Sequence, residues 1–229
     1  MPNRNKADEI HSSWWRSSLL RLYENLARND AVQPVDLIFV MAGRMERKQY
    51  GLELFRAGVS PKLVLSIGRF EVSKMCNLDL EGIDDLMITR GQTSPDERHF
   101  FMIVDRSGVR IEKAGLLIWN TYGEALALQQ VLEKEKARHV MVISTDIHLR
   151  RVALALGKVS RGEAVEFLYC PVPSRPMFCR KEGWWTRPDD RRFVLRETMK
   201  LAGYGVILSL PRTVARRIMQ LNGGNHSTD

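Results

Sequence analysis

The sequence has 229 residues, 44% of them hydrophobic and 27% charged, which is enough for one large α/β domain with a full core. Its longest apolar run, at 201–210, is too short for a membrane-spanning helix, which needs about 20 residues. The three cysteines are widely spaced without a metal-binding pattern, and the first residues lack the layout of a signal peptide. We therefore expect a cytoplasmic protein without an integral membrane segment.

The net charge of +8 is concentrated towards the C-terminus, where residues 171–221 contain eleven Lys or Arg and four Asp or Glu. Such a region can attract nucleic acid, an anionic membrane surface or an acidic small molecule. No helix-turn-helix, zinc-finger or aromatic RNA-binding pattern accompanies it, which disfavours nucleic acid. A solvated basic face is the favoured interpretation, with peripheral membrane binding as an alternative.

The N-terminal part of the chain alternates helices with strands rich in β-branched residues. In chain order we expect a helix at 8–28, a strand at 35–41, a helix at 44–57, a strand at 62–67 and short helices near 71–77 and 82–86. Arg44, Arg47 and Lys48 crowd the first turn of the helix at 44–57. Because a helix start carries partial positive charge and free amides, these cations indicate a bound anion. Side chains that simply extend into water are the alternative.

A β-hairpin interrupts this alternation. The segment at 94–97 is a capping box that predicts a short helix, and His99 near its end is interpreted as structural. Strands at 101–105 and 109–113 flank an Arg-Ser-Gly turn, which is typical of a hairpin. We expect the hairpin at the sheet edge or as a flap over a site.

A short strand at 116–119 is expected to precede a long helix that ends near residue 137. Thr121 and Glu124 have the spacing of a capping box with Thr121 as the N-cap, so the helix start itself explains both residues. Asn120, at the strand tip, is freer to meet a ligand.

The most informative stretch is the strand at 140–143 with the amphipathic helix that follows it. Ser144 and Thr145, at the junction, are residue types that favour helix starts. His148 and Arg151 lie in the first turns of the helix, which is the second cluster of basic residues at a helix start. This repetition favours an anion site. His148 is the natural general acid or base there.

The remaining elements are a strand at 165–170, an irregular loop at 173–188, helices at 189–208 and 211–221, and a disordered tail at 222–229. The loop carries two adjacent tryptophans and several basic residues, as lids and binding walls often do. Residues 1–221 are thus predicted to form a single domain with its core at about 35–205.

The fold class expected from these elements is α/β, with a Rossmann-like, mostly parallel sheet, helices on both faces, a β-hairpin insertion and helical terminal extensions. In such a sheet the strand-to-helix junctions share one edge, where ligands bind. The residues expected to meet at this edge are Gly43, Arg44, Ser66, Asn120, Ser144, Thr145 and His148.

The order of these segments resembles the YdcF/SanA/ElyC-like family, a bacterial group with a Rossmann-like α/β domain. The similar segments are DLIFVMAGRMERKQYGLELFRAGVSPKLVLSIG (36–68), NTYGEALAL (120–128), VMVISTDIHLRRVALAL (140–156) and RETMKLAGYG (196–205). The positions that match the family's motifs are Arg47, Ser66, Asn120, Thr121, Glu124, Ser144, His148 and Arg151. The chain departs from the family at Ala42-Gly43, where paired glycines are usual, and at Ile67 in the second strand tip.

The resemblance implies a fold more firmly than a reaction. The family has no settled activity; it is associated with envelope maintenance and with an S-adenosylmethionine-type ligand. Many relatives carry a membrane-spanning N-terminal segment that this chain lacks, so an envelope location is not transferred.

The favoured function is an enzyme that hydrolyses or transfers a group of a phosphate- or carboxylate-bearing metabolite. The candidate catalytic residues are His148 as acid or base and Glu124 or Glu197 to orient it. The candidate ligand-binding residues are Gly43, Arg44, Arg47, Ser66, Asn120, Thr121, Ser144, Thr145 and Arg151. No metal site is expected. The alternatives are a non-catalytic module for a nucleotide or S-adenosylmethionine, and attachment to nucleic acid or anionic lipid through residues 171–221. The oligomeric state is left open.

Overall fold

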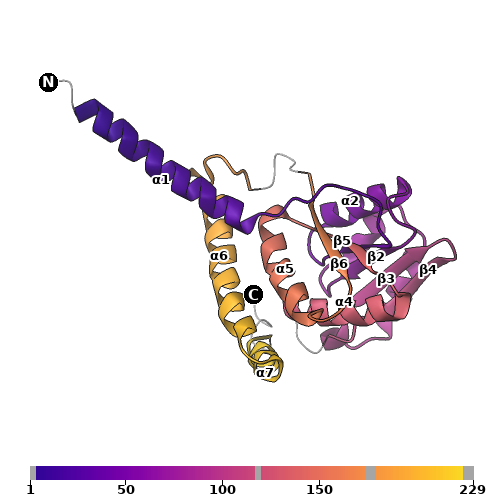
Figure 1. Ribbon diagram of the computed structural model, residues 1–229. Coiled ribbons are helices and arrows are strands. Elements are labelled where there is room, and N and C mark those ends of the chain that lie inside the picture. Colours follow the sequence, from indigo (N-terminus) through magenta and orange to yellow (C-terminus); the bar gives the residue numbers. More distant parts are fainter. Residues whose placement is uncertain (1–3, 117–119, 174–178, 224–229) are drawn as a thin grey trace.

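A six-stranded sheet in the order β4-β3-β2-β1-β5-β6 organises the computed structural model, which describes residues 4–116, 120–173 and 179–223 (Figure 1). The strands are β1 (Leu37–Val40), β2 (Leu63–Ile67), β3 (Phe100–Asp105), β4 (Gly108–Lys113), β5 (His139–Ser144) and β6 (Glu166–Pro171). β1 pairs in parallel with both β2 and β5, and β6 is parallel to β5. The hairpin β3–β4 continues the sheet antiparallel to β2. The strand order therefore reverses between β1 and β5, and ligands of open α/β sheets bind at such a reversal.

The α-helices are α1 (Arg4–Leu26), α2 (Met45–Arg56), α3 (Ile83–Gly91), α4 (Thr121–Glu135), α5 (Asp146–Val159), α6 (Pro188–Ser209) and α7 (Arg212–Gly223). Short 3-10 helices are η1 (Val72–Asn77), η2 (Pro95–Glu97) and η3 (Trp184–Thr186). No helix within the described ranges combines the length and the apolar character that crossing a membrane requires.

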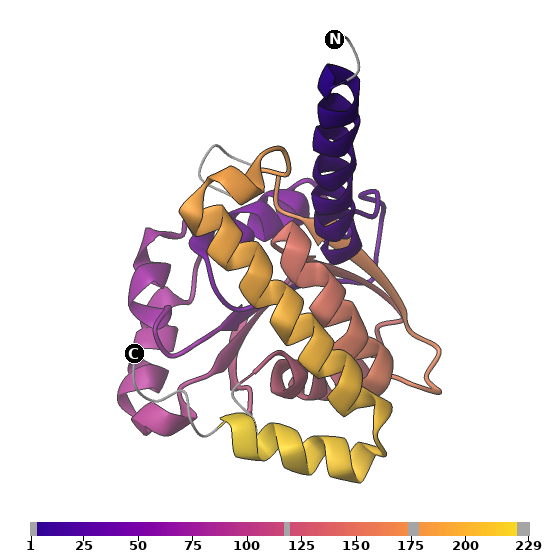
Figure 2. The ribbon, with the colours of Figure 1, turned by 90° about the vertical axis from the view of Figure 1, so that its left-hand side faces the viewer.

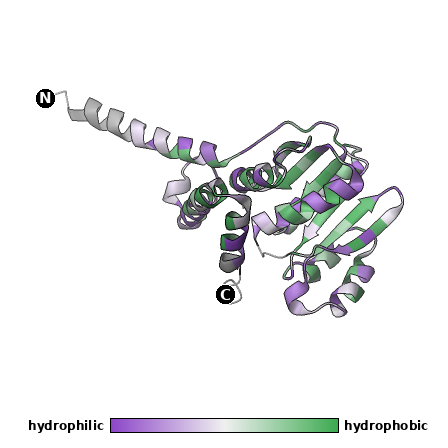
Figure 3. Ribbon diagram, turned by 60° about the horizontal axis from the view of Figure 1, so that its bottom comes forward, coloured by the Kyte–Doolittle hydropathy of each residue, from purple (hydrophilic) through white to green (hydrophobic). Residues whose placement is uncertain are grey.

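Helices cover both faces of the sheet because successive strand residues point to opposite sides. In β1, Leu37 and Phe39 pack with α4 and α5, whereas Ile38 and Val40 pack with α2, η1 and α3. The strand ribbons are accordingly the most hydrophobic part of the molecule in Figure 3. The predicted Rossmann-like α/β class, with its hairpin and helical extensions, is confirmed.

Helix α6 joins the core through Tyr204 and Leu208, and its N-terminal half meets α1 through a third apolar cluster, which includes Tyr23, Trp184 and Val194. The N-terminal part of α1 extends away from the body, and α6 runs along α5 (Figures 1 and 2). α6 thereby covers the end of the sheet where β1 and β5 stop.

Several predicted elements differ in detail from the observed ones. The helix predicted at 71–77 is the 3-10 helix η1, and that at 82–86 extends to Gly91. The capping box at 94–97 is wrong, because Ser94 makes no side-chain cap bond and only a 3-10 turn forms. Leu116 is not in a strand, and the rest of the predicted strand at 116–119 lies outside the described residues, as do 174–178 of the loop and 224–229 of the tail.

Candidate functional site

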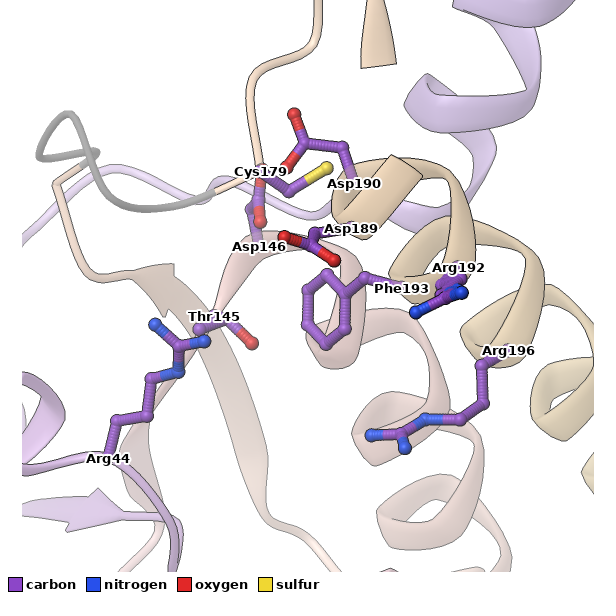
Figure 4. A pocket seen from close by; sticks show the side chains of 9 residues that line it. All are labelled: Arg44, Thr145, Asp146, Cys179, Asp189, Asp190, Arg192, Phe193 and Arg196. Carbon is purple, nitrogen blue, oxygen red and sulfur yellow. The ribbon is translucent and has the colours of Figure 1, made fainter. Parts of the chain in front are cut away.

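Two adjacent pockets lie along α6 at the carboxyl edge of the sheet. The first, here called the His148 pocket, has a volume of about 490 Å³. It is lined by Ala42, His99, Leu116, Asn120, Thr121, Glu124, His148, Arg151, Lys200, Gly203, Tyr204, Ile207 and Met219. The second, the Arg44 pocket of Figure 4, has a volume of about 460 Å³. It is lined by Arg44, Thr145, Asp146, Cys179, Asp189, Asp190, Arg192, Phe193 and Arg196.

The predicted site is thus divided. Asn120, Thr121, Glu124, His148 and Arg151 line the His148 pocket. Arg44 and Thr145 line the Arg44 pocket instead. The other predicted residues (Gly43, Arg47, Ser66, Ser144 and Glu197) line neither pocket, but each contacts a residue near one of them.

His148 is fixed by two hydroxyl groups. Ser144 Oγ lies 2.7 Å from Nδ1, and Thr121 Oγ1 lies 3.3 Å from Nε2. Burial, together with the positive charges of Arg151, Arg47 and Lys200, lowers the pKa of His148 well below its usual 6.5. The imidazole is therefore neutral at physiological pH. Thr121 Oγ1 also accepts a hydrogen bond from Arg151 and hydrogen-bonds Tyr204, so its contact with Nε2 is the longer of the two that hold the ring.

This lowered pKa predicts a specific loss of stability in acid. Below about pH 6.5 His148 becomes protonated in the unfolded chain but not in the native state. The free energy of unfolding therefore decreases as the pH falls, by up to about 1.4 kcal/mol per pH unit, until the pKa of His148 in the native state is reached. In His148→Gln, the decrease in the free energy of unfolding between about pH 6.5 and pH 5.5 should be smaller by roughly 1 kcal/mol. Urea unfolding at the two pH values measures this difference. The exposed His139→Gln is the control. An unchanged slope in His148→Gln would contradict a neutral His148.

The start of α4 differs from the prediction. Asn120, not Thr121, is the N-cap: its side chain accepts hydrogen bonds from the backbone N–H groups of Tyr122 (2.9 Å) and Gly123 (3.1 Å). The predicted capping box is therefore wrong, and the Asn120 carbonyl oxygen is engaged by the helix. Thr121 is the first helical residue, which turns its hydroxyl towards Arg151 and His148. Glu124 reaches across to accept from the Ala42 backbone N–H at 2.8 Å.

Neither predicted carboxylate contacts His148. Glu197 forms a buried two-point ion pair with Arg151, whose Nε and Nη2 lie 3.1 Å and 3.0 Å from Oε2. Glu124 is fully enclosed, and burial raises its pKa. The group that orients His148 at Nδ1 is Ser144. Glu197 instead fixes Arg151, which contacts Thr121.

A carboxylate that sequence reasoning overlooked occupies the amides at the tips of β1 and β2. Glu71 Oε1 accepts from Gly43 N–H (2.6 Å) and Gly68 N–H (3.3 Å). Lys48, fully buried, forms an ion pair with the same carboxylate. The amide of Gly43 and the charge of Lys48 are therefore satisfied within the protein. Gly43 itself has φ +127°, and a Cβ there would lie 2.8 Å from Arg47 Nη1, so only glycine fits.

Arg47 is in a different situation. Its side chain is 8% exposed, and its Nη1 and Nη2 donate to Ala42 O (2.5 Å) and Thr145 Oγ1 (3.2 Å). Nε has no hydrogen-bond partner, and within the described residues no carboxylate lies within 4.0 Å of this guanidinium. Burial lowers the pKa of Arg47 to about 10, so it remains charged. Glu124, Glu71 and Glu197 favour the charged form from a distance, but among the described residues Arg47 has no direct ion pair.

His99, interpreted as structural from the sequence, also lines the His148 pocket. Its Nε2 lies 2.7 Å from Ser66 Oγ, and Ser66 also hydrogen-bonds Glu124. Burial lowers the pKa of His99 to about 4. Its position follows from the antiparallel pairing of β3 with β2, which places it beside Ser66. No local pattern in the sequence indicates that pairing.

Comparisons of the chain with models of protein families, with curated proteins and with solved structures find no match. The resemblance to the YdcF/SanA/ElyC-like family stays a prediction. In the described part of the chain, no group of three or more His, Cys, Asp or Glu side chains has an arrangement that could hold a metal ion.

Proposed function

We propose that this chain belongs to the YdcF/SanA/ElyC-like family and binds a phosphate- or carboxylate-bearing metabolite at the carboxyl edge of its sheet. The observation that carries the proposal is the buried guanidinium of Arg47, which has no direct ion pair with a described residue and whose Nε has no hydrogen-bond partner. Burying a charge without a close partner is costly, and the more distant carboxylates of Glu124, Glu71 and Glu197 offset only part of that cost. A ligand anion near Arg47 would supply a direct counter-charge.

The His148 pocket suits such a ligand for a second reason. Arg151, Arg47 and Lys200 all disfavour a positive charge on His148 and so add to the effect of burial on its pKa. The pKa of Lys200 is itself lowered by burial; Glu197 opposes this shift, whereas Arg151 and Arg196 add to it. An anion in the pocket would relieve this repulsion.

The reaction we propose is hydrolysis or group transfer with His148 as the proton acceptor. A neutral imidazole can remove the proton of an attacking water or hydroxyl as the new bond to phosphorus or carbon forms. The same proton then passes to the leaving group as its bond breaks. Ser144 holds the ring at Nδ1 so that Nε2 is the reactive nitrogen. A cytoplasmic location fits a soluble metabolite as substrate.

The test begins with a thermal-shift screen of the full chain against phosphate, phosphorylated sugars, nucleotides and S-adenosylmethionine, since ligands that prefer the native state raise its melting point. Ligands that bind are then incubated with the protein, and product formation is followed. His148→Gln should retain the ligand-induced shift but lose turnover by about 10²- to 10⁴-fold, whereas the exposed His139→Gln should retain both. Full turnover in His148→Gln would refute the assigned role. Binding without turnover by the unmodified chain would favour the alternative, a non-catalytic module for a nucleotide or S-adenosylmethionine.

A further inference from the structure

The Arg44 pocket and the His148 pocket follow one another along α6. Its residues that line the Arg44 pocket are Asp189, Asp190, Arg192, Phe193 and Arg196, and those that line the His148 pocket are Lys200, Gly203, Tyr204 and Ile207. From α5 and its N-cap, Thr145 belongs to the first and His148 to the second. Arg196 and Lys200 are one helical turn apart, about 6 Å along the axis. One ligand of moderate length can therefore reach both pockets.

The Arg44 pocket has its own means of holding an anion. Arg44, from the loop between β1 and α2, extends towards Thr145, and Arg192 and Arg196 line the same pocket from α6, on the other side of the Phe193 ring (Figure 4). A guanidinium can grip a phosphate or carboxylate with two parallel hydrogen bonds.

The acidic residues of the Arg44 pocket offset part of this positive charge. Asp190 is already paired with Arg187, so the three arginines face two other carboxylates, Asp189 and Asp146, of which Asp146 also accepts a hydrogen bond from the Tyr23 hydroxyl at 2.5 Å. Asp189 lies in the first turn of α6, where the helix dipole stabilises a carboxylate. It is exposed and can accept a hydrogen bond from a hydroxyl group of the ligand.

Arg47 links the two pockets. Its guanidinium donates to the carbonyl of Ala42, a residue that lines the His148 pocket, and to the hydroxyl of Thr145, which lines the Arg44 pocket. This buried cation, which has no direct ion pair with a described residue, is therefore located between the two pockets. A negative charge in either pocket would compensate it further.

We infer that the ligand carries two separate anionic groups on a hydroxylated scaffold, one group in each pocket, as in a sugar bisphosphate. This inference rests on the proposed function and narrows its substrate class. The two phosphates of a diphosphate share a bridging oxygen, so they lie too close together to enter separate pockets a helical turn apart. The group in the His148 pocket is the one that reacts, because His148 is there. The group in the Arg44 pocket contributes binding.

The test compares fructose 6-phosphate with fructose 1,6-bisphosphate by isothermal titration calorimetry on the full chain. The bisphosphate should bind at least about tenfold more tightly than the monophosphate, which is the effect of one additional charge-assisted contact. Arg196→Gln should reduce this preference to less than about threefold. Arg191→Gln makes the same charge change on an exposed position of α6 outside both pockets, and should preserve the preference.

Lys200→Gln separates this inference from the proposed function. Because Lys200 lines the His148 pocket, the variant should bind both fructose 6-phosphate and fructose 1,6-bisphosphate more weakly. Equal affinity for the two probes, with a loss in Lys200→Gln, would overturn the two-pocket ligand and leave the anion site intact. A preference that survives in Arg196→Gln would also overturn it. If neither probe binds, both proposals fail for sugar phosphates, and thermal unfolding of each variant shows whether it is folded.

Discussion

Replacing Arg151 with methionine is expected to lower the free energy of unfolding by about 3–5 kcal/mol, the usual cost of removing one partner of a buried ion pair. Arg151 and Glu197 are both buried, and two guanidinium nitrogens contact the carboxylate. Without Arg151, Lys200 at 3.4 Å is the ion-pair partner that remains for this carboxylate among the described residues. Urea unfolding at neutral pH measures the loss.

The double variant Arg151→Met with Glu197→Leu should recover most of this loss, because an apolar pair of similar size avoids an uncompensated buried charge. Arg150→Met, at the exposed neighbouring position of α5, should change stability by less than about 0.5 kcal/mol. A loss below about 1 kcal/mol in Arg151→Met would mean that the ion pair is not what holds α6 against α5.

The Arg151–Glu197 ion pair also shows which features could be predicted from the sequence and which could not. Runs of β-branched residues identified the parallel strands, and the rule that their junctions share an edge correctly placed Asn120 and His148 in one pocket and Arg44 and Thr145 in the neighbouring one. The partner of each charge was not predictable in the same way. Arg151 meets a glutamate 46 positions away, and only the packing of α6 on α5 decides that.

Neighbouring residues of similar chemistry posed a different difficulty. Asn120 and Thr121 can both serve as N-caps, and the sequence does not show where the extended backbone ends. The structure has extended dihedral angles at Asn120, so the cap lies one residue earlier than predicted and Thr121 faces the pocket. A shift of one residue in a helix start thus changed which side chain is available for a ligand.

Backbone amides at the sheet edge proved equally unpredictable. The glycine at the tip of β1 suggested an amide free for an anion, but Glu71, from the start of η1, already accepts from Gly43 and Gly68. Lys48 is neutralised by the same residue. Of the cations in the first turn of α2, Arg47 is the buried one that has no ion pair with a described residue.

Arg47→Met therefore tests whether that cation serves the fold or a ligand. If it serves a ligand, the free energy of unfolding of the variant should be within about 1 kcal/mol of that of the unmodified chain in the absence of anions, because the loss of two hydrogen bonds is offset by removing a buried charge that has no direct ion pair. The same variant should lose the stabilisation that an anion gives the unmodified chain, about 2.7 kcal/mol at one hundred times the dissociation constant. Urea unfolding with and without phosphate measures both quantities.

The matched control is Arg56→Met, on the same helix but at an exposed position, which should keep the response to phosphate. If Arg47→Met destabilises the protein by several kcal/mol and still responds to phosphate, its bonds to Ala42 and Thr145 are structural. If Arg47→Met is as stable as the unmodified chain but no longer responds to phosphate, the charge of Arg47 contributes to binding and not to stability. Functional sites commonly keep residues that do not stabilise the fold. The unsatisfied Nε of Arg47 favours the second outcome, since a purely structural arginine would be expected to have all its donors paired.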